Sequence, residues 1–264
     1  MPAAVITSYL AIGDSFTEGT GDAYSDGSER GWADLVAFAL AAAASPAEFR
    51  YANLAIRGRK LAGILAEQFR PAVAQRPDLI SINGGGNDML RPTMKLADAD
   101  TAIRDAVLRA RDAVGHVLLL SGGDPTEHLP MGRVAQRRGL ELQAMVEVWA
   151  RVEEGVTVCD NFSDTRLRSP EHWAPDGLHL NTRGHARVAQ NVLRALGAPE
   201  PPELAVLAEH VAPVVDYRSR AYYREHVLPW VGRRLRGRSS GDGRLPKRAE
   251  LAPLAFDPDR PFER

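Results

Sequence analysis

Short apolar runs alternate with longer amphipathic segments along most of this chain, and this alternation restricts the fold more than any other feature. The apolar runs are predicted strands at Val5–Ile12, Phe49–Leu54, Leu79–Asn83, Val117–Ser121 and Val156–Cys159. The amphipathic segments are predicted helices at Trp32–Ala44, Lys60–Gln75, Ala97–Val114, Arg133–Glu153 and Thr182–Leu196. Strands that alternate with helices form right-handed crossovers and a mainly parallel sheet covered on both faces. The sequence therefore predicts an α/β fold with a five-stranded, mainly parallel, doubly wound sheet of the flavodoxin-like type.

The sequence changes character after Gly197, where three prolines follow within "APEPPEL" and prevent the last predicted helix from continuing. We predict a main domain at residues 1–198 and a basic helical extension with a flexible tail at residues 199–264. The helices expected in the extension are Glu203–Val211 and Ser219–Arg236. Proline 71 interrupts the Lys60–Gln75 pattern, so a kink or helix end is predicted near Arg70.

The charge distribution limits the partners that this chain is expected to have. The formal net charge is -1, which argues against a general polyanion-binding protein. Residues 218–248 nevertheless contain ten Lys and Arg against two acidic residues. This basic stretch is either a solvated helical face or a contact for an anionic membrane surface. It lacks RNA-binding and zinc-finger patterns, so no nucleic-acid partner is predicted.

Cysteine usage and hydropathy indicate a cytoplasmic globular protein. Cys159 is the one cysteine, which excludes an intramolecular disulfide and fits a reducing compartment. No basic region precedes the first apolar stretch, so we expect no signal peptide. No apolar run approaches the roughly 18 residues that span a bilayer.

Four polar segments follow predicted strands or precede the last helix of the main domain. They are "GDSFTEG" with Asp14 and Ser15, "NLAIRG" with Asn53 and Gly58, "GGGND" with Asn87, and "APDGLHLNTRGH" with Asp176 and His179. Because the carboxyl ends of parallel strands lie on one edge of the sheet, these segments are expected to converge there.

The residue types in these segments match the needs of acyl transfer. A serine hydroxyl attacks a carbonyl only when a base removes its proton, and histidine titrates in the appropriate range. A carboxylate orients the imidazole and stabilises its cation. Ser15, His179 and Asp176 supply these roles, and Gly177 permits the tight turn that aims Asp176 and His179 the same way. The Ser15 and Gly58 N–H groups and the Asn87 amide are candidate donors to the oxyanion.

These motifs resemble those of the SGNH (GDSL) hydrolase family, whose Ser, Gly, Asn and His types occur here in the family's order. The matching segments span Val5 to about Leu196 and contain Ser15, Gly58, Asn87 and the Asp176–His179 pair. Phe16 stands where the family often has leucine. The resemblance implies a three-layer α/β/α fold and a metal-independent esterase, lipase, thioesterase or deacetylase. Asp14 is expected to order the turn or to support the Asn87 loop, and Asn53 to form hydrogen bonds at its strand end or to steady the oxyanion loop.

Other chemistries are weakly represented in the sequence. A metal site would use the His172, Asp176, His179 and His185 stretch, but HExxH and cysteine pairs are missing, so no metal or other cofactor is predicted. The predicted function is hydrolysis of a small-molecule acyl ester. Alternatives are an O-acetyl-sugar deacetylase or acyl-thioesterase on the same residues, or a non-catalytic binding module. A wide polar groove would favour sugar, and a long apolar tunnel would favour lipid.

Overall fold

The computed structural model describes residues 6–89, 94–128, 132–211, 215–217, 219–229, 232, 239–254 and 262 of the chain. Its centre is a six-stranded sheet in the order β5-β4-β3-β1-β2-β6. The strands are β1 (Ser8–Ile12), β2 (Arg50–Asn53), β3 (Leu79–Ile82), β4 (His116–Leu120), β5 (Val156–Cys159) and β6 (Arg248–Pro253). Strands β1 to β5 are parallel, as predicted, and β6 is antiparallel to β2.

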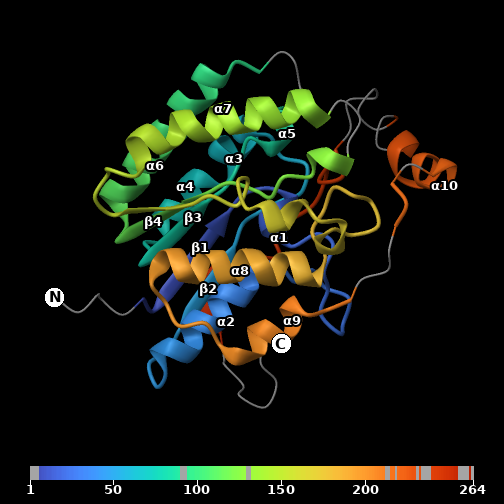
Figure 1. Ribbon diagram of the computed structural model, residues 1–264. Helices are drawn as coiled ribbons and strands as arrows, with labels where there is room; N and C mark the ends of the chain where they lie inside the picture. The colour runs from blue at the N-terminus through green and yellow to red at the C-terminus, as the bar shows by residue number, and fades with distance from the viewer. Residues whose placement is uncertain are drawn as a thin grey trace.

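Helices cover both faces of the sheet and give the predicted three layers (Figure 1). One face carries α2 (Trp32–Ala44) and α8 (Thr182–Leu196), and the other carries α3 (Leu61–Glu67), α4 (Phe69–Ala74), α6 (Leu96–Ala113) and α7 (Gly132–Ala150). Successive side chains of β1 point to opposite faces of the sheet and so join two separate hydrophobic cores. Tyr9 and Ala11 pack on the α2–α8 side, and Leu10 and Ile12 pack on the opposite side.

The shorter elements lie in the connections. They are α1 (Ser15–Glu18), α5 (Gly86–Met89), α9 (Pro202–Ala208) and α10 (Arg220–Tyr222), the 3₁₀ turns η1 (Thr126–His128), η2 (Thr165–Arg168) and η3 (Pro170–His172), and the π-helical turn η4 (Tyr223–Val227). No helix among the described ranges is both long and apolar enough to cross a membrane.

The predicted helix at Lys60–Gln75 is divided into α3 and α4 at Gln68, three residues before the proline. The Gln68 side chain forms two hydrogen bonds with Gly13: its Oε1 accepts from the main-chain N–H, and its Nε2 donates to the carbonyl, both at 2.9 Å. Pro71 then falls in the first turn of α4, where a missing N–H removes no helical hydrogen bond.

The prediction of five strands is wrong by one, because residues from the expected tail form β6. This edge strand pairs with β2, and the Arg248 guanidinium donates to the Tyr51 carbonyl at 2.8 Å and lies over the Tyr51 ring. Its partner is almost two hundred residues earlier, and its half-exposed, polar sequence lacks a strand pattern. In the extension, α9 starts close to its predicted position. Of the helix predicted at Ser219–Arg236, residues 230–231 and 233–236 lie outside the described residues.

Candidate active site

Ser15 lies at the junction between the central strand β1 and the short helix α1. Asp14 is the N-cap of this helix, and its Oδ1 accepts from the Phe16 N–H at 3.1 Å. Gly13 is required by close packing, since a Cβ there would lie 2.5 Å from Thr17 Oγ1. The tight turn therefore places the serine at the carboxyl edge of the sheet, beside the topological switch point between β1 and β3.

Asp176 and His179 form a hydrogen-bonded pair within one turn before α8. The carboxylate Oδ2 lies 2.5 Å from His179 Nδ1, and Oδ1 accepts from the Leu178 and His179 main-chain N–H groups at 3.0 Å. The Ala174 N–H donates to the His179 carbonyl at 2.8 Å and closes the turn. Asp176 thus holds both the main chain and the imidazole of the histidine.

Competing effects determine the ionisation of Asp176. Burial alone would raise the pKa of this carboxyl, but the hydrogen bonds from His179 and the nearby main-chain N–H groups outweigh burial. The resulting pKa of Asp176 is about 2, well below its usual value. The carboxylate is therefore ionised throughout the neutral range and directs the Nδ1–H toward itself, which leaves Nε2 free to accept a proton.

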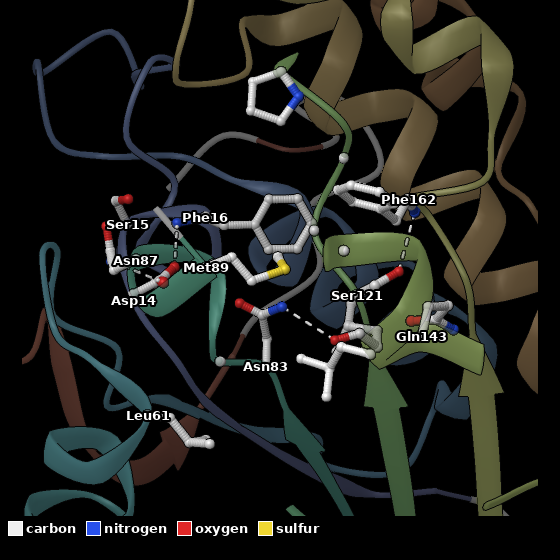
Figure 2. Close-up of a pocket in the computed structure, with 18 of the residues that line it drawn as sticks. Asp14, Ser15, Phe16, Leu61, Asn83, Asn87, Met89, Ser121, Gln143 and Phe162 are labelled. Atoms are coloured by element: carbon white, nitrogen blue, oxygen red, sulfur yellow. Dashed lines mark hydrogen bonds between the residues drawn. The ribbon is translucent and has the colours of Figure 1, made fainter. Parts of the chain in front are cut away.

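Asn87 follows β3 at the start of α5 and turns its amide toward the loop that carries Ser15 (Figure 2). Its Nδ2 donates to Asp14 Oδ2 and to the Arg59 carbonyl, both at 3.0 Å. Both amide hydrogens are therefore engaged. The next residue, Asp88, accepts from the Leu61 N–H at 2.9 Å and caps α3.

Asp14 is a buried carboxyl with an unusual ionisation. Burial raises the pKa of Asp14 to about 6, although the Phe16 N–H and the nearby His179 act in the opposite direction. The sequence predicts that Asp14 orders the turn. Its hydrogen bonds to Phe16 and Asn87 also connect the ends of β1 and β3.

Gly58 and Asn53 lie beside this region and do not line the pocket described below. Gly58 has a φ of +73° in the loop after β2, and the neighbouring Arg59 carbonyl connects it to the Asn87 amide. Asn53 is fully buried at the end of β2, where its Nδ2 donates to the Thr17 carbonyl at 2.9 Å. Asn53 therefore fixes α1, the helix that begins with Ser15.

Ser15, His179 and Asn87 line one pocket, which extends between the sheet and the helices α6 and α7. Figure 2 shows Ser15, Asn87 and Asp14 together at one side, with Phe16 and Met89 beside them. Away from the polar group the walls are mainly apolar: Ile82, Leu119 and Val158 come from the strands, and Ile103, Leu142 and Val146 come from the two helices. The cavity volume is about 170 Å³.

The pocket walls contributed by α6 and α7 were not identified from the sequence. Leu142 and Val146 follow a helical period and are nearly buried, as core residues are. Only the way α7 packs distinguishes a residue that lines a cavity from one that fills the core. Among the described residues, no group of three His, Cys, Asp or Glu side chains is arranged to hold a metal ion.

Residues 11–187 match the GDSL-like Lipase/Acylhydrolase family. The chain belongs to this family. The match includes every candidate site residue, from Asp14 to His179, and ends within α8, so the whole extension lies beyond it. Among curated proteins, no sequence gives a significant match.

Two solved structures illustrate how the GDSL-like family fold is preserved at low sequence identity. The lipase Lip_vut3 from a goat rumen metagenome has a TM-score of 0.58 and 21% identity, covering 71% of this chain and 96% of that chain. The acetylxylan esterase Axe2 from Geobacillus stearothermophilus has a TM-score of 0.58 and 23% identity, covering 73% of this chain and 95% of that chain. At this identity the likeness establishes the fold.

Proposed function

We propose that this protein is a carboxylic ester hydrolase that cleaves acyl esters through a covalent acyl-enzyme on Ser15. The observation that carries the proposal is the Asp176–His179 pair, whose imidazole lines the same pocket as the serine. A nucleophile and a base in one pocket, with a carboxylate behind the base that orients it, are the components of acyl transfer.

The proposed reaction has two halves. His179 Nε2 takes the Ser15 proton as Oγ attacks the ester carbonyl, and the new C–O bond gives a tetrahedral oxyanion. When the intermediate collapses, the bond to the leaving alcohol breaks and His179 donates the proton to that oxygen. Water then attacks the acyl-enzyme with His179 again acting as base, and the carboxylic acid is released.

The oxyanion is assigned to three donors: the Ser15 N–H, the Gly58 N–H and the Asn87 amide. All three follow parallel strands and so come from one edge of the sheet. Ser15 and Asn87 line the pocket, whereas Gly58 lies in the adjoining loop after β2, so its N–H contributes only when that loop turns toward the substrate. Since Asn87 already donates to Asp14 and the Arg59 carbonyl, it must exchange or share one of these bonds as the oxyanion forms. Losing one such donor typically costs about 3–4 kcal/mol of transition-state stabilisation.

The pocket favours an acyl chain over a sugar as the group that it holds. Its walls beyond the catalytic group are mainly aliphatic and aromatic, which suits an alkyl chain better than a polyhydroxylated ring. The polar side chains there are Asn83, Ser121, Thr126 and Gln143. The volume of about 170 Å³ is close to the ~150 Å³ apolar cavity that accommodates the six carbons of benzene. We therefore propose acyl chains of medium length as the preferred substrates.

The test is a series of p-nitrophenyl esters from acetyl to dodecanoyl, with acetylated xylose oligomers and acyl-CoA thioesters in parallel. We expect kcat/KM to rise from the acetyl to the hexanoyl ester, and Ser15→Ala to abolish turnover and labelling by a fluorophosphonate probe. Full turnover by Ser15→Ala would refute the proposed mechanism. Preference for acetylated sugar over the hexanoyl ester would refute the assignment of the pocket.

A further inference from the structure

The C-terminal extension, which lies wholly beyond the family match, returns to the two loops that carry the proposed catalytic residues. Its short helix α10 stands at the edge of the molecule in Figure 1. Tyr222, the last residue of α10, is 4% exposed because it packs against the Asp176–His179 turn. Residues 239–241 pack on the opposite loop, around Gly58.

Tyr222 holds the main chain of the residue whose carboxylate orients the proposed base. Its hydroxyl donates to the Asp176 carbonyl at 2.8 Å, across 46 residues of sequence. The carboxylate of the same aspartate accepts from His179 Nδ1 at 2.5 Å. Two hydrogen bonds, both made by Asp176, therefore connect the Tyr222 phenol to the proposed catalytic imidazole.

The approach of the extension to this turn is close enough to require glycine. Gly177 has a φ of +63°, and a Cβ there would lie 2.9 Å from the Tyr217 ring and 3.0 Å from Tyr222 Oη. Tyr217 adds a second hydrogen bond, to the Ala174 carbonyl at 3.3 Å, and its ring meets that of Tyr222 edge-on at 5.3 Å. Two tyrosines from the extension thus contact both ends of the Ala174–Gly177 turn.

The extension also contacts the Gly58 loop. A Cβ on Gly58 would lie 2.1 Å from Ser239 Oγ, and a Cβ on Gly241 would lie 2.0 Å from the Arg57 carbonyl. Lys247 then anchors the segment, since its Nζ donates to the Glu18 carbonyl at the end of α1 and to a carboxylate oxygen of Asp34, each at 2.5 Å. The same extension is therefore fixed near α1, the helix that begins with Ser15.

We propose that the C-terminal extension positions the catalytic residues, with Tyr222 as the positioning residue for the Asp176–His179 pair. The proposal rests on the ester hydrolase function proposed above. Tyr222 touches neither the substrate nor the reacting atoms. It fixes the Asp176 carbonyl, and this restricts the turn to the one arrangement in which the carboxylate meets His179 Nδ1.

The state of the phenol supports this role across a wide pH range. Burial, together with the adjacent Asp176, raises the pKa of Tyr222 above its usual value. The hydroxyl therefore remains a donor through the neutral and moderately alkaline range, in which Asp176 is ionised. A displacement of catalytic groups by a fraction of an ångström is enough to slow an enzyme without affecting substrate binding.

The test compares Tyr222→Phe with Tyr223→Phe in the full-length chain. Both substitutions remove one phenol oxygen from adjacent positions, but Tyr223 is 43% exposed and serves as the matched control. Steady-state kinetics with p-nitrophenyl hexanoate give kcat and KM separately, and thermal unfolding of each variant confirms that it is folded at the assay temperature. Ser15→Ala is measured alongside.

Loss of one hydrogen bond in a preorganised turn predicts a fall in kcat of about five- to tenfold for Tyr222→Phe, with KM within about twofold. Tyr223→Phe should match the unsubstituted protein. The proposal is overturned if Tyr222→Phe retains full kcat, if both variants lose activity equally, or if KM and the unfolding temperature change while kcat does not. An active Ser15→Ala variant would instead refute the proposed function, so the two failures are distinguishable.

Discussion

The buried carboxyl of Asp14 makes the stability of this protein depend on pH in a way that one substitution isolates. Asp14 is 5% exposed, and its two carboxylate oxygens accept from the Phe16 N–H and the Asn87 amide. Burial raises the pKa of Asp14 from 3.8 to about 6. Asp14→Asn replaces the neutral acid by an isosteric amide that never ionises.

The magnitude follows from linkage. Because the pKa is higher in the folded than in the unfolded protein, the folded state binds the proton more tightly, and ionised Asp14 destabilises the fold. A shift of roughly two pKa units corresponds to about 3 kcal/mol. This cost is absent below pH 3.8, where both states are protonated, develops between pH 3.8 and about 6, and is complete above about pH 6.

The assay is urea unfolding at 25 °C of the unsubstituted protein and Asp14→Asn, at unit intervals from pH 4 to pH 8. We expect the unfolding free energy of Asp14→Asn, relative to that of the unsubstituted protein, to rise by about 3 kcal/mol between pH 4 and pH 7. The amide nitrogen cannot accept the bond that one carboxylate oxygen accepts, which adds an offset that does not vary with pH. A difference that stays constant across the series would refute the assignment, as would an Asp14→Asn variant that loses relative stability as the pH rises.

Three further expectations concern the oxyanion site, the anchor of the extension and the pocket. Asn87→Ala should lower kcat for p-nitrophenyl esters by roughly 10²- to 10³-fold with little change in KM, and a fall of less than tenfold would contradict its role. Lys247→Met should lower the free energy of unfolding in urea by about 3 kcal/mol, because it leaves the buried Asp34 carboxylate without its cation; an unchanged midpoint would contradict this. Leu142→Trp should lower kcat/KM for the octanoyl ester by more than tenfold while sparing the acetyl ester, and an equal effect on both would place Leu142 outside the acyl site.

Much of the fold could be predicted because its sequence signals are local. The five parallel strands are short apolar runs between amphipathic helices. Because these strands are parallel, the polar residues at their carboxyl ends lie at one edge of the sheet. Ser15 and Asn87 are examples, since each directly follows a strand. The Asp176–His179 pair is closed by a three-residue spacing within one turn, which is also a local property.

The features that the sequence did not predict depend on contacts between distant segments. Strand β6 forms because the β2 edge is available to pair with it, and neither strand's sequence encodes that pairing. The contact of Tyr222 with Asp176 requires the extension to return across the site. The hydrophobic periodicity of a short segment does not reveal which distant segment it will contact.

The arrangement around Asn87 explains why a protein would keep an unfavourable buried carboxylate at Asp14. A charged acceptor holds an amide donor more strongly than a neutral carbonyl does. Of the two bonds made by Asn87, the one to Asp14 is therefore the stronger when Asp14 is ionised, and the one to the Arg59 carbonyl is the one released to an oxyanion. Asp14 thus fixes the orientation of Asn87 during this exchange. On this reasoning Asp14→Asn gains stability above pH 6 and has a lower kcat at the same pH. A variant that gained both stability and kcat would show that the Asp14 carboxylate is not needed to orient the Asn87 amide.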